Sequence, residues 1–213
     1  MNQQVWREAC GTLAGDVIGI RRFASARWPM SGQTGLLTAE EFAALHADGV
    51  RLELIRGELC VMPPAFADHG ETVGALHAIL GAYVRTYNLG KMYSAETGFL
   101  VARNPDSIRT TDIAFIQRNR LTPEAVAPTW NPVMPDLVVE VVASRDRAPE
   151  IAGKVEMWIE AGVRMVWVVY RLRRTVEIFQ PHRQMLLVGE QEQLTGTDVI
   201  PGFFTPVAAI FAE

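Results

Sequence analysis

Two short apolar runs in the middle of the chain each carry an acidic residue in a strongly hydrophobic context. Glu140 interrupts the run LVVEVV at 137–142, which otherwise predicts a strand that is covered on both faces. Asp112 stands directly before IAFI at 113–116, a second predicted strand. An ionised carboxylate buried in such a strand is costly unless a positive group meets it. Since neither sequence neighbour of Glu140 is basic, we expect a divalent metal shared with Asp112, with Lys154 nearby.

The pattern ahead of these strands predicts a helix, a hairpin and a long helix. Thr38 and Glu41 have the spacing of a capping box at the start of the first helix. Residues 51–62 predict a β-hairpin with a tight turn at 56–57. The long helix is expected over 68–87, where apolar residues recur at three- and four-residue steps. His69 and His77 share its apolar face, where a histidine is usually a packed residue, but His69 lies at the helix start, where a site could open.

The rest of the chain alternates predicted strands and helices. We expect a strand over 93–102, a proline-broken segment over 122–135, a helix over 148–161 ending at Gly162, a buried strand over 164–170 and a closing antiparallel pair over 175–180 and 184–188. This order predicts one α/β domain around a mixed sheet, spanning residues 36–213. Residues 1–35 lack sustained periodicity and are interpreted as an N-terminal extension.

Lys154 is the basic residue best placed to serve Glu140. On the predicted helix, Lys154 lies about 60° from Ile151 at 100° per residue, so it flanks the buried stripe and its ammonium could reach over the adjacent strand end. The position two residues after Glu140 is Val142, which cannot supply a charge. The alternative is an ordinary boundary lysine whose stem covers apolar surface.

Composition narrows the classes of function. The chain has 213 residues, of which 49% are apolar and 21% charged, as in ordinary globular proteins. A net charge of −4 excludes a general coat of positive charge, so nucleic-acid binding must depend on local patches. Cys10 and Cys60 are too few for a disulfide framework or a zinc site, which fits a reducing, cytoplasmic setting. We expect no membrane helix and no secretory signal.

The ordered set of motifs resembles a known family. Asp112, Glu140 and a lysine on the following helix resemble a PD-(D/E)XK nuclease core whose lysine has migrated onto the helix. More specifically, the chain resembles the Uma-two family of restriction endonucleases from about residue 37 to residue 170. The likeness lies in LELIRGEL, the helix start near His69, TTDIAFI, PDLVVEVV, Lys154 and EAGVRMVWVV. The resemblance implies a restriction-endonuclease-like α/β fold and phosphodiester hydrolysis that depends on Mg²⁺ or Mn²⁺.

The resemblance also implies roles for individual residues. Asp112 and Glu140 would hold the metal, helped by the main-chain carbonyl of Val141. Lys154 would orient the attacking water or steady the developing charge. Glu53 would support the metal site, unless it is a plain exposed strand residue, and His69 matches the helix-start histidine of the family. Four positions depart from the family pattern, namely Arg56, Thr111, Ala143 and Tyr170, and they weaken inferences about substrate more than those about catalysis.

DNA is the expected substrate and a homodimer the expected assembly. Arg118 and Arg120, in the loop after the Asp112 strand, are the predicted phosphate contacts if that loop borders the active cleft. Two other functions stay open at this point. One is a non-catalytic nucleic-acid-binding or regulatory module on a nuclease-like fold, and the other is a structural dimerisation domain in which Glu140 pairs with an arginine.

Overall fold

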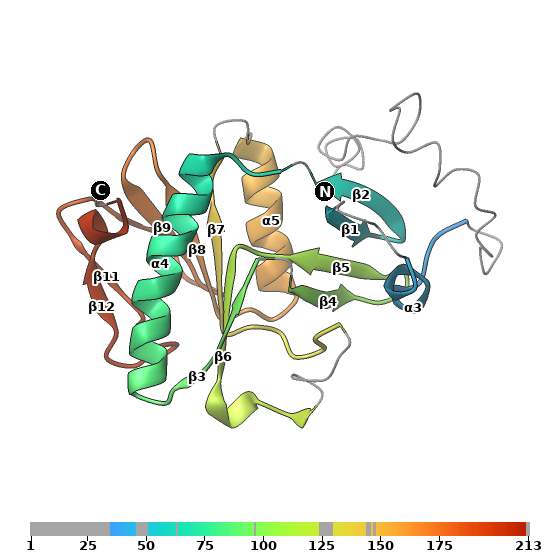
Figure 1. Cartoon of the computed structure of the whole chain (residues 1–213), viewed down its shortest axis with the longest axis horizontal. Coiled ribbons are helices and arrows are strands. Elements are labelled where there is room, and N and C mark those ends of the chain that lie inside the picture. Colours follow the sequence, from blue (N-terminus) through green and yellow to red (C-terminus); the bar gives the residue numbers. More distant parts are fainter. Residues whose placement is uncertain are drawn as a thin grey trace.

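A six-stranded mixed sheet forms the centre of the protein (Figure 1). The computed structural model describes residues 35–45, 51–62, 64–95, 97–123, 130–143, 146 and 148–211. The strand order is β10-β9-β8-β7-β6-β3. Their bounds are β3 Gly90–Ser94, β6 Ile113–Gln117, β7 Leu137–Val141, β8 Met165–Tyr170, β9 Thr175–Phe179 and β10 Leu186–Val188. Only the β7–β8 pair is parallel among these neighbours, and the crossover between them is the helix α5, Ala148–Glu160.

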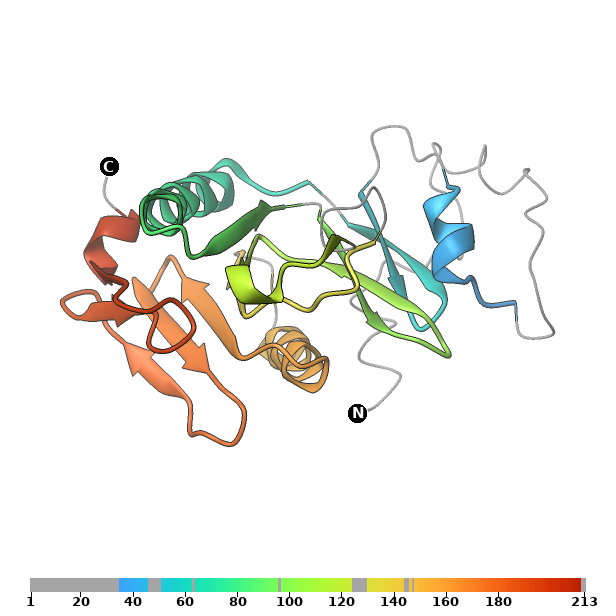
Figure 2. The same ribbon diagram turned by 90° about the horizontal axis from the view of Figure 1, so that it is seen from below.

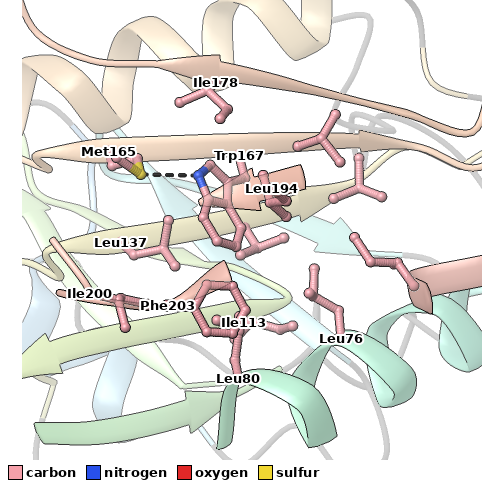
Figure 3. Packing of buried hydrophobic residues seen from close by; sticks show 14 of the residues in the cluster. Leu76, Leu80, Ile113, Leu137, Met165, Trp167, Ile178, Leu194, Ile200 and Phe203 are labelled. Carbon is pink, nitrogen blue, oxygen red and sulfur yellow. Dashed lines mark hydrogen bonds between the residues drawn. The ribbon is translucent and has the colours of Figure 1, made fainter. Parts of the chain in front are cut away.

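Helices α4, Ala67–Thr86, and α5 pack on opposite faces of this sheet (Figure 2). Successive strand residues point to opposite faces, so Val139 of β7 packs with the α4 side and Val138 with the α5 side. The α4 side centres on Trp167, whose indole N–H lies 3.0 Å from the Met165 sulfur (Figure 3). Because both faces are covered, the central strands consist mostly of apolar residues, and a charge within them, such as Glu140 of β7, needs a partner.

A second, four-stranded antiparallel sheet lies beside the first, in the order β2-β1-β5-β4. Its strands are β1 Arg51–Ile55, β2 Glu58–Met62, β4 Gly98–Ala102 and β5 Ser107–Thr110, and the short helix α3, Ala39–Ala43, packs on it. Strand β5 ends only two residues before Asp112, and β6 of the first sheet begins directly after it. The chain therefore passes from one sheet to the other at the acidic residue singled out above.

Most expected elements are confirmed, with one error in the middle. The capping box of Thr38 and Glu41, the 51–62 hairpin, the long helix, the Glu140 strand and the αL stop at Gly162 are all present. The single strand expected over 93–102 is wrong, because a turn closed by Thr97 N–H to Ser94 carbonyl splits it into β3 and β4 of different sheets. A C-terminal pair, β11 Gln193–Thr195 and β12 Phe204–Pro206, and the 3₁₀ helix η3, Val207–Phe211, were not predicted.

Several expectations fall outside or only partly inside the described residues. The N-terminal extension belongs almost wholly to residues outside them, as does the middle of the proline-broken segment. Among the helices that are described, none is long and apolar enough to cross a bilayer. Cys60 of β2 is disulfide-bonded. Since disulfides are uncommon in reducing compartments, the cytoplasmic setting stays an expectation.

Candidate active site

The antiparallel register of β6 and β7 brings Asp112 and Glu140 to the same end of the sheet. Ile113 pairs with Val139, and continuing that register by one residue places Asp112 opposite Glu140. Helices α4 and α5 both begin at this end, which is uppermost in Figure 1. Two carboxylates far apart in sequence are therefore neighbours, with a helix start on either side of them.

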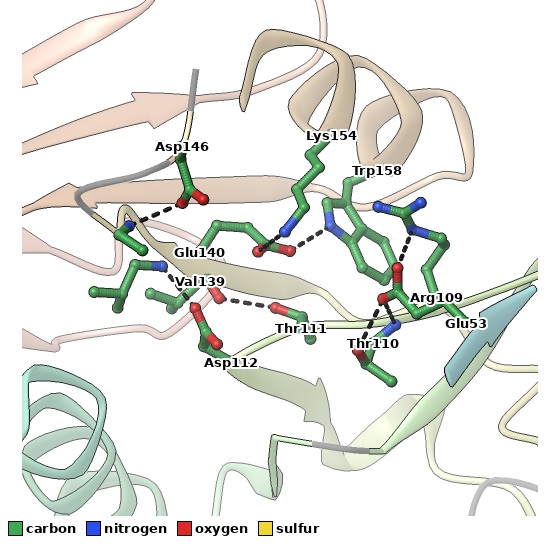
Figure 4. Close-up of polar contacts among 12 residues, drawn as sticks. Glu53, Arg109, Thr110, Thr111, Asp112, Val139, Glu140, Asp146, Lys154 and Trp158 are labelled. Atoms are coloured by element: carbon green, nitrogen blue, oxygen red, sulfur yellow. Dashed lines mark hydrogen bonds and ion pairs between the residues drawn. The ribbon is translucent and has the colours of Figure 1, made fainter. Parts of the chain in front are cut away.

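Glu140 is buried, with 7% of its surface exposed, and both of its carboxylate oxygens are engaged by α5 (Figure 4). Its Oε2 lies 3.1 Å from the Lys154 ammonium, and its Oε1 accepts a 2.9 Å hydrogen bond from the Trp158 indole N–H. Lys154 and Trp158 are four residues apart, so they stand on one side of the helix. Burial raises the pKa of Glu140, which the Lys154 ammonium opposes, and the Glu140 carboxylate raises the pKa of Lys154.

Asp112 is held from the other side of the sheet. Its Oδ2 accepts the Val141 backbone N–H at 2.8 Å and lies 3.2 Å from His69 Nε2, in the first turn of α4. The hydrogen bond to Asp112 raises the pKa of His69. Thr111, where the family usually has proline, donates its hydroxyl to the Val139 carbonyl at 2.8 Å and thereby ties the approach of Asp112 to β7. The two carboxylates are thus each matched by a basic side chain, one from each helix.

Glu53 is buried rather than exposed, so its interpretation as a plain surface residue is wrong. It is 2% exposed and sits opposite Arg109 across the β1–β5 pair. Its Oε1 accepts both the backbone N–H and the hydroxyl of Thr110 at 2.8 Å, and its Oε2 lies 3.3 Å from Arg109 Nε. The Glu53 charge also contributes to the raised pKa of Lys154. Glu53 therefore holds the end of β5 two residues before Asp112 and lies within electrostatic reach of the lysine.

Arg118 and Arg120 lie at the other end of the sheet. They form the 3₁₀ helix η1, Arg118–Arg120, which follows the five residues of β6, a span of roughly 17 Å from Asp112. Arg118 Nε donates to the Asn88 carbonyl at 2.8 Å. Arg120 Nη1 lies 2.8 Å from Oδ1 of Asp136, a fully buried carboxylate that also meets Arg164. The structure does not bring these two arginines to the acidic pair.

The donors at the site suit a hard divalent cation. Within the described residues, Val141 N–H and His69 both contact Oδ2 of Asp112, so Oδ1 is the oxygen that Asp112 can offer to a cation. Each Glu140 oxygen has one recorded partner there and keeps lone-pair capacity for another. No group of three or more His, Cys, Asp or Glu that could enclose a metal occurs in that part of the chain. Mg²⁺ commonly takes only one or two carboxylates and keeps its waters, which fits this set better than zinc.

Trp158 was not among the residues that we singled out for the site, although it belongs to it. Its ring is fully buried between the sheet and α5, and its N–H is aimed at Glu140. The available signal was its spacing of four residues from Lys154, together with the rule that a buried indole N–H needs an acceptor.

Comparisons with known proteins show the family and the fold of the chain. The family profile "Uma2: Putative restriction endonuclease" matches residues 39–208. A search of curated proteins finds no match. Among solved structures, a "putative nuclease belonging to DUF820" from Anabaena variabilis superposes with a TM-score of 0.70 at 15% identity, covering 82% of this chain and 97% of that one. At that identity the structural likeness establishes the fold alone, which this chain shares with the Anabaena variabilis protein.

Proposed function

Because the chain belongs to the Uma2 family, whose profile covers residues 39–208, we propose that it is a nuclease that hydrolyses DNA phosphodiester bonds with a bound divalent metal. Membership of the family supports a nuclease-like function and no finer property. The metal, the migrated lysine and the DNA substrate are our proposal. The observation that carries it is the buried contact of Glu140 with both Lys154 and Trp158 beside Asp112.

The proposed division of labour follows from the contacts. Asp112 and Glu140, with the Val141 carbonyl, would hold Mg²⁺ or Mn²⁺. When bound, such an ion lowers the pKa of its water and neutralises charge on the phosphate. Lys154 keeps an ammonium beside Glu140, where it can orient the attacking water or stabilise negative charge that develops on the phosphoryl oxygens. Trp158 fixes the Glu140 carboxylate, and the Val141 N–H fixes that of Asp112.

A purely structural role explains this cluster less well. Burying a carboxylate and an ammonium is expensive, and apolar residues of similar volume would often stabilise a fold as well or better. Most side chains packed around β7 are apolar, and the fully buried Asp136 directly before the strand is met by two arginines. A strand that accepts a buried glutamate under these conditions is typical of a functional site.

The test is cleavage of supercoiled plasmid with Mg²⁺, with Mn²⁺ and with chelator, for the wild-type protein and for Glu140→Gln. We expect nicked or linear product only with metal and wild-type protein. Glu140→Gln keeps the volume and an acceptor for Trp158 but loses the charge, so it should abolish cleavage while the protein stays folded. Equal cleavage by both proteins, or cleavage in chelator, would contradict the proposal.

A non-catalytic nucleic-acid-binding module is the second candidate. The observation that favours it is that each Glu140 oxygen already accepts one hydrogen bond, from Lys154 or from Trp158, which leaves less room for a metal. Calorimetric titration separates the two functions, because a nuclease must bind Mg²⁺ in a manner that Glu140→Gln removes. The third candidate, an arginine-paired structural glutamate, does not match the structure, since the basic partner of Glu140 is Lys154.

A further inference from the structure

An acidic protein that acts on DNA needs positive charge close to its active site. The net charge is −4, and η1 with Arg118 and Arg120 lies at the far end of the sheet. At the same end as Asp112 and Glu140, the turn between β8 and β9 carries a dense group of arginines, in the sequence RLRR at 171–174.

The register of the sheet places this turn beside the acidic pair. Strand β8 runs parallel to β7, with Val168 level with Glu140 and Val169 level with Val141, so Arg171 follows two residues beyond that level. Helix α4 provides a second link. Glu71 Oε2 lies 3.2 Å from Arg171 Nη2, and His69, two residues earlier on the helix, meets Asp112. The turn and the start of α4 lie at the same end of the molecule in Figure 1.

The side chains of the turn are presented to solvent. Leu172 is 85% exposed, which places the tip of the turn outside the packed core. The Arg171 side chain is 38% exposed and that of Glu71 is 59% exposed, and an ion pair with this much contact to solvent contributes little to stability. A phosphate can therefore replace the Glu71 carboxylate at little cost. Arg173 is exposed, and its guanidinium lies over the ring of Tyr170 at 5.2 Å, a residue that packs with the α5-side cluster.

Arg174 differs from its neighbours. Its Nε is 2.6 Å from Glu190 and its Nη1 donates to the Phe211 carbonyl, so it is directed toward the C-terminal segment. The outward pair is thus Arg171 and Arg173.

We propose that Arg171 and Arg173 bind backbone phosphates of duplex DNA beside the active site. This inference rests on the proposed function for its choice of ligand. Guanidinium groups are well matched to phosphate, and contacts of this kind position the duplex without reading its sequence.

The test is the salt dependence of DNA binding by the full-length protein. Fluorescence anisotropy with a labelled duplex of mixed sequence is measured in chelator, so that no cleavage occurs, for wild type and Arg171→Ala/Arg173→Ala. Loss of two phosphate contacts should make the slope of log K against log salt less negative by about 1.8 and should weaken binding at every salt concentration. Glu71→Gln, which removes the competing carboxylate, should tighten binding instead.

The matched control is Arg85→Ala/Arg183→Ala. It makes the same change of charge at two exposed arginines, one in the last turn of α4 and the other in the β9–β10 turn, both at the opposite end of the sheet. Its slope should stay close to that of wild type. Circular dichroism and thermal melting confirm that each variant is folded.

The outcomes separate this inference from the proposed function. An unchanged slope in Arg171→Ala/Arg173→Ala, an equal change in the control, or a wild-type protein without measurable affinity for the duplex overturns the inference. Wild-type protein that binds DNA with the expected dependence but cleaves nothing in Mg²⁺ overturns the nuclease proposal and leaves the phosphate contacts in place.

Discussion

Replacing Lys154 by methionine removes the charge beside Glu140 while keeping most of the side-chain stem. In the structure the Lys154 ammonium is 3.1 Å from Glu140 Oε2 and its side chain is 30% exposed. On the proposed function, the cleavage rate should fall by about 10²–10³-fold, which is typical for the loss of a preorganised group that stabilises developing charge. Lysine is not a metal ligand, so Mg²⁺ binding should persist.

Stability should also fall, because the substitution leaves Glu140 buried with Trp158 as its remaining recorded partner. Breaking a buried pair by removing one partner costs about 3–5 kcal/mol, and partial exposure of Lys154 reduces this to about 2 kcal/mol. Burial already raises the pKa of Glu140, and without the Lys154 ammonium only the Trp158 hydrogen bond still opposes this shift. The stability deficit should therefore be small at acidic pH, where the carboxyl is protonated, and grow as pH rises.

The assays are plasmid nicking in Mg²⁺ and urea denaturation at acidic and alkaline pH. Glu140→Gln/Lys154→Met completes a double-mutant cycle, and the double variant should recover stability relative to Lys154→Met, because no buried charge is left. Wild-type cleavage by Lys154→Met would refute the assignment of the migrated lysine. A stability deficit independent of pH would refute the account of Glu140.

Two further changes test the contact of Trp158 within the site and that of Arg120 at the other end of the sheet. Trp158→Phe removes the indole N–H that Glu140 accepts, and should lower the free energy of unfolding by about 1.5–3 kcal/mol, the range for a hydrogen bond to a charged group. Calorimetry should also show a weaker Mg²⁺ affinity. Unchanged stability and unchanged affinity would contradict the positioning role of Trp158. Arg120→Ala should lower the free energy of unfolding in urea by roughly 1–3 kcal/mol, because the buried Asp136 carboxylate loses one of its basic partners. The salt dependence of DNA binding should stay unchanged. A flatter salt dependence would show that Arg120 contacts phosphate after all.

The sequence predicted the parts of the site that are encoded by local pattern. Glu140 and Asp112 stood out because a carboxylate inside an apolar run has few explanations. Lys154 followed from helical periodicity, and its contact with Glu140 is present in the structure. The proximity of Asp112 and Glu140 depends on the antiparallel register of β6 and β7, which the sequence pattern alone does not fix.

The direction of a strand decides which residues meet, and the sequence pattern does not give that direction. Arg118 is only six positions from Asp112 in sequence, yet β6 carries it to the opposite end of the sheet. Arg171 is far away in sequence, yet the parallel pairing of β7 and β8 brings its turn to the site end. The splitting of the 93–102 segment had a similar cause, since the pattern does not show that β3 and β4 join different sheets. Tertiary pairing, rather than local propensity, made these choices.

On the proposed function, His69 should give the site a pH dependence that links metal binding to proton release. The hydrogen bond to Asp112 raises the pKa of His69 above its ordinary 6.5, so without metal the pair contributes stability that is complete below that value and is lost as pH rises through the raised pKa. A divalent cation on Asp112 would repel the imidazolium and favour its neutral form. Mg²⁺ affinity should therefore increase with pH across this window, and calorimetry in two buffers of different ionisation enthalpy should show proton release. His69→Gln should abolish both effects, whereas His77→Gln, about two turns further along α4, should retain them. Equal apparent enthalpies in the two buffers, with an affinity that does not change with pH, would show that His69 is not coupled to the metal.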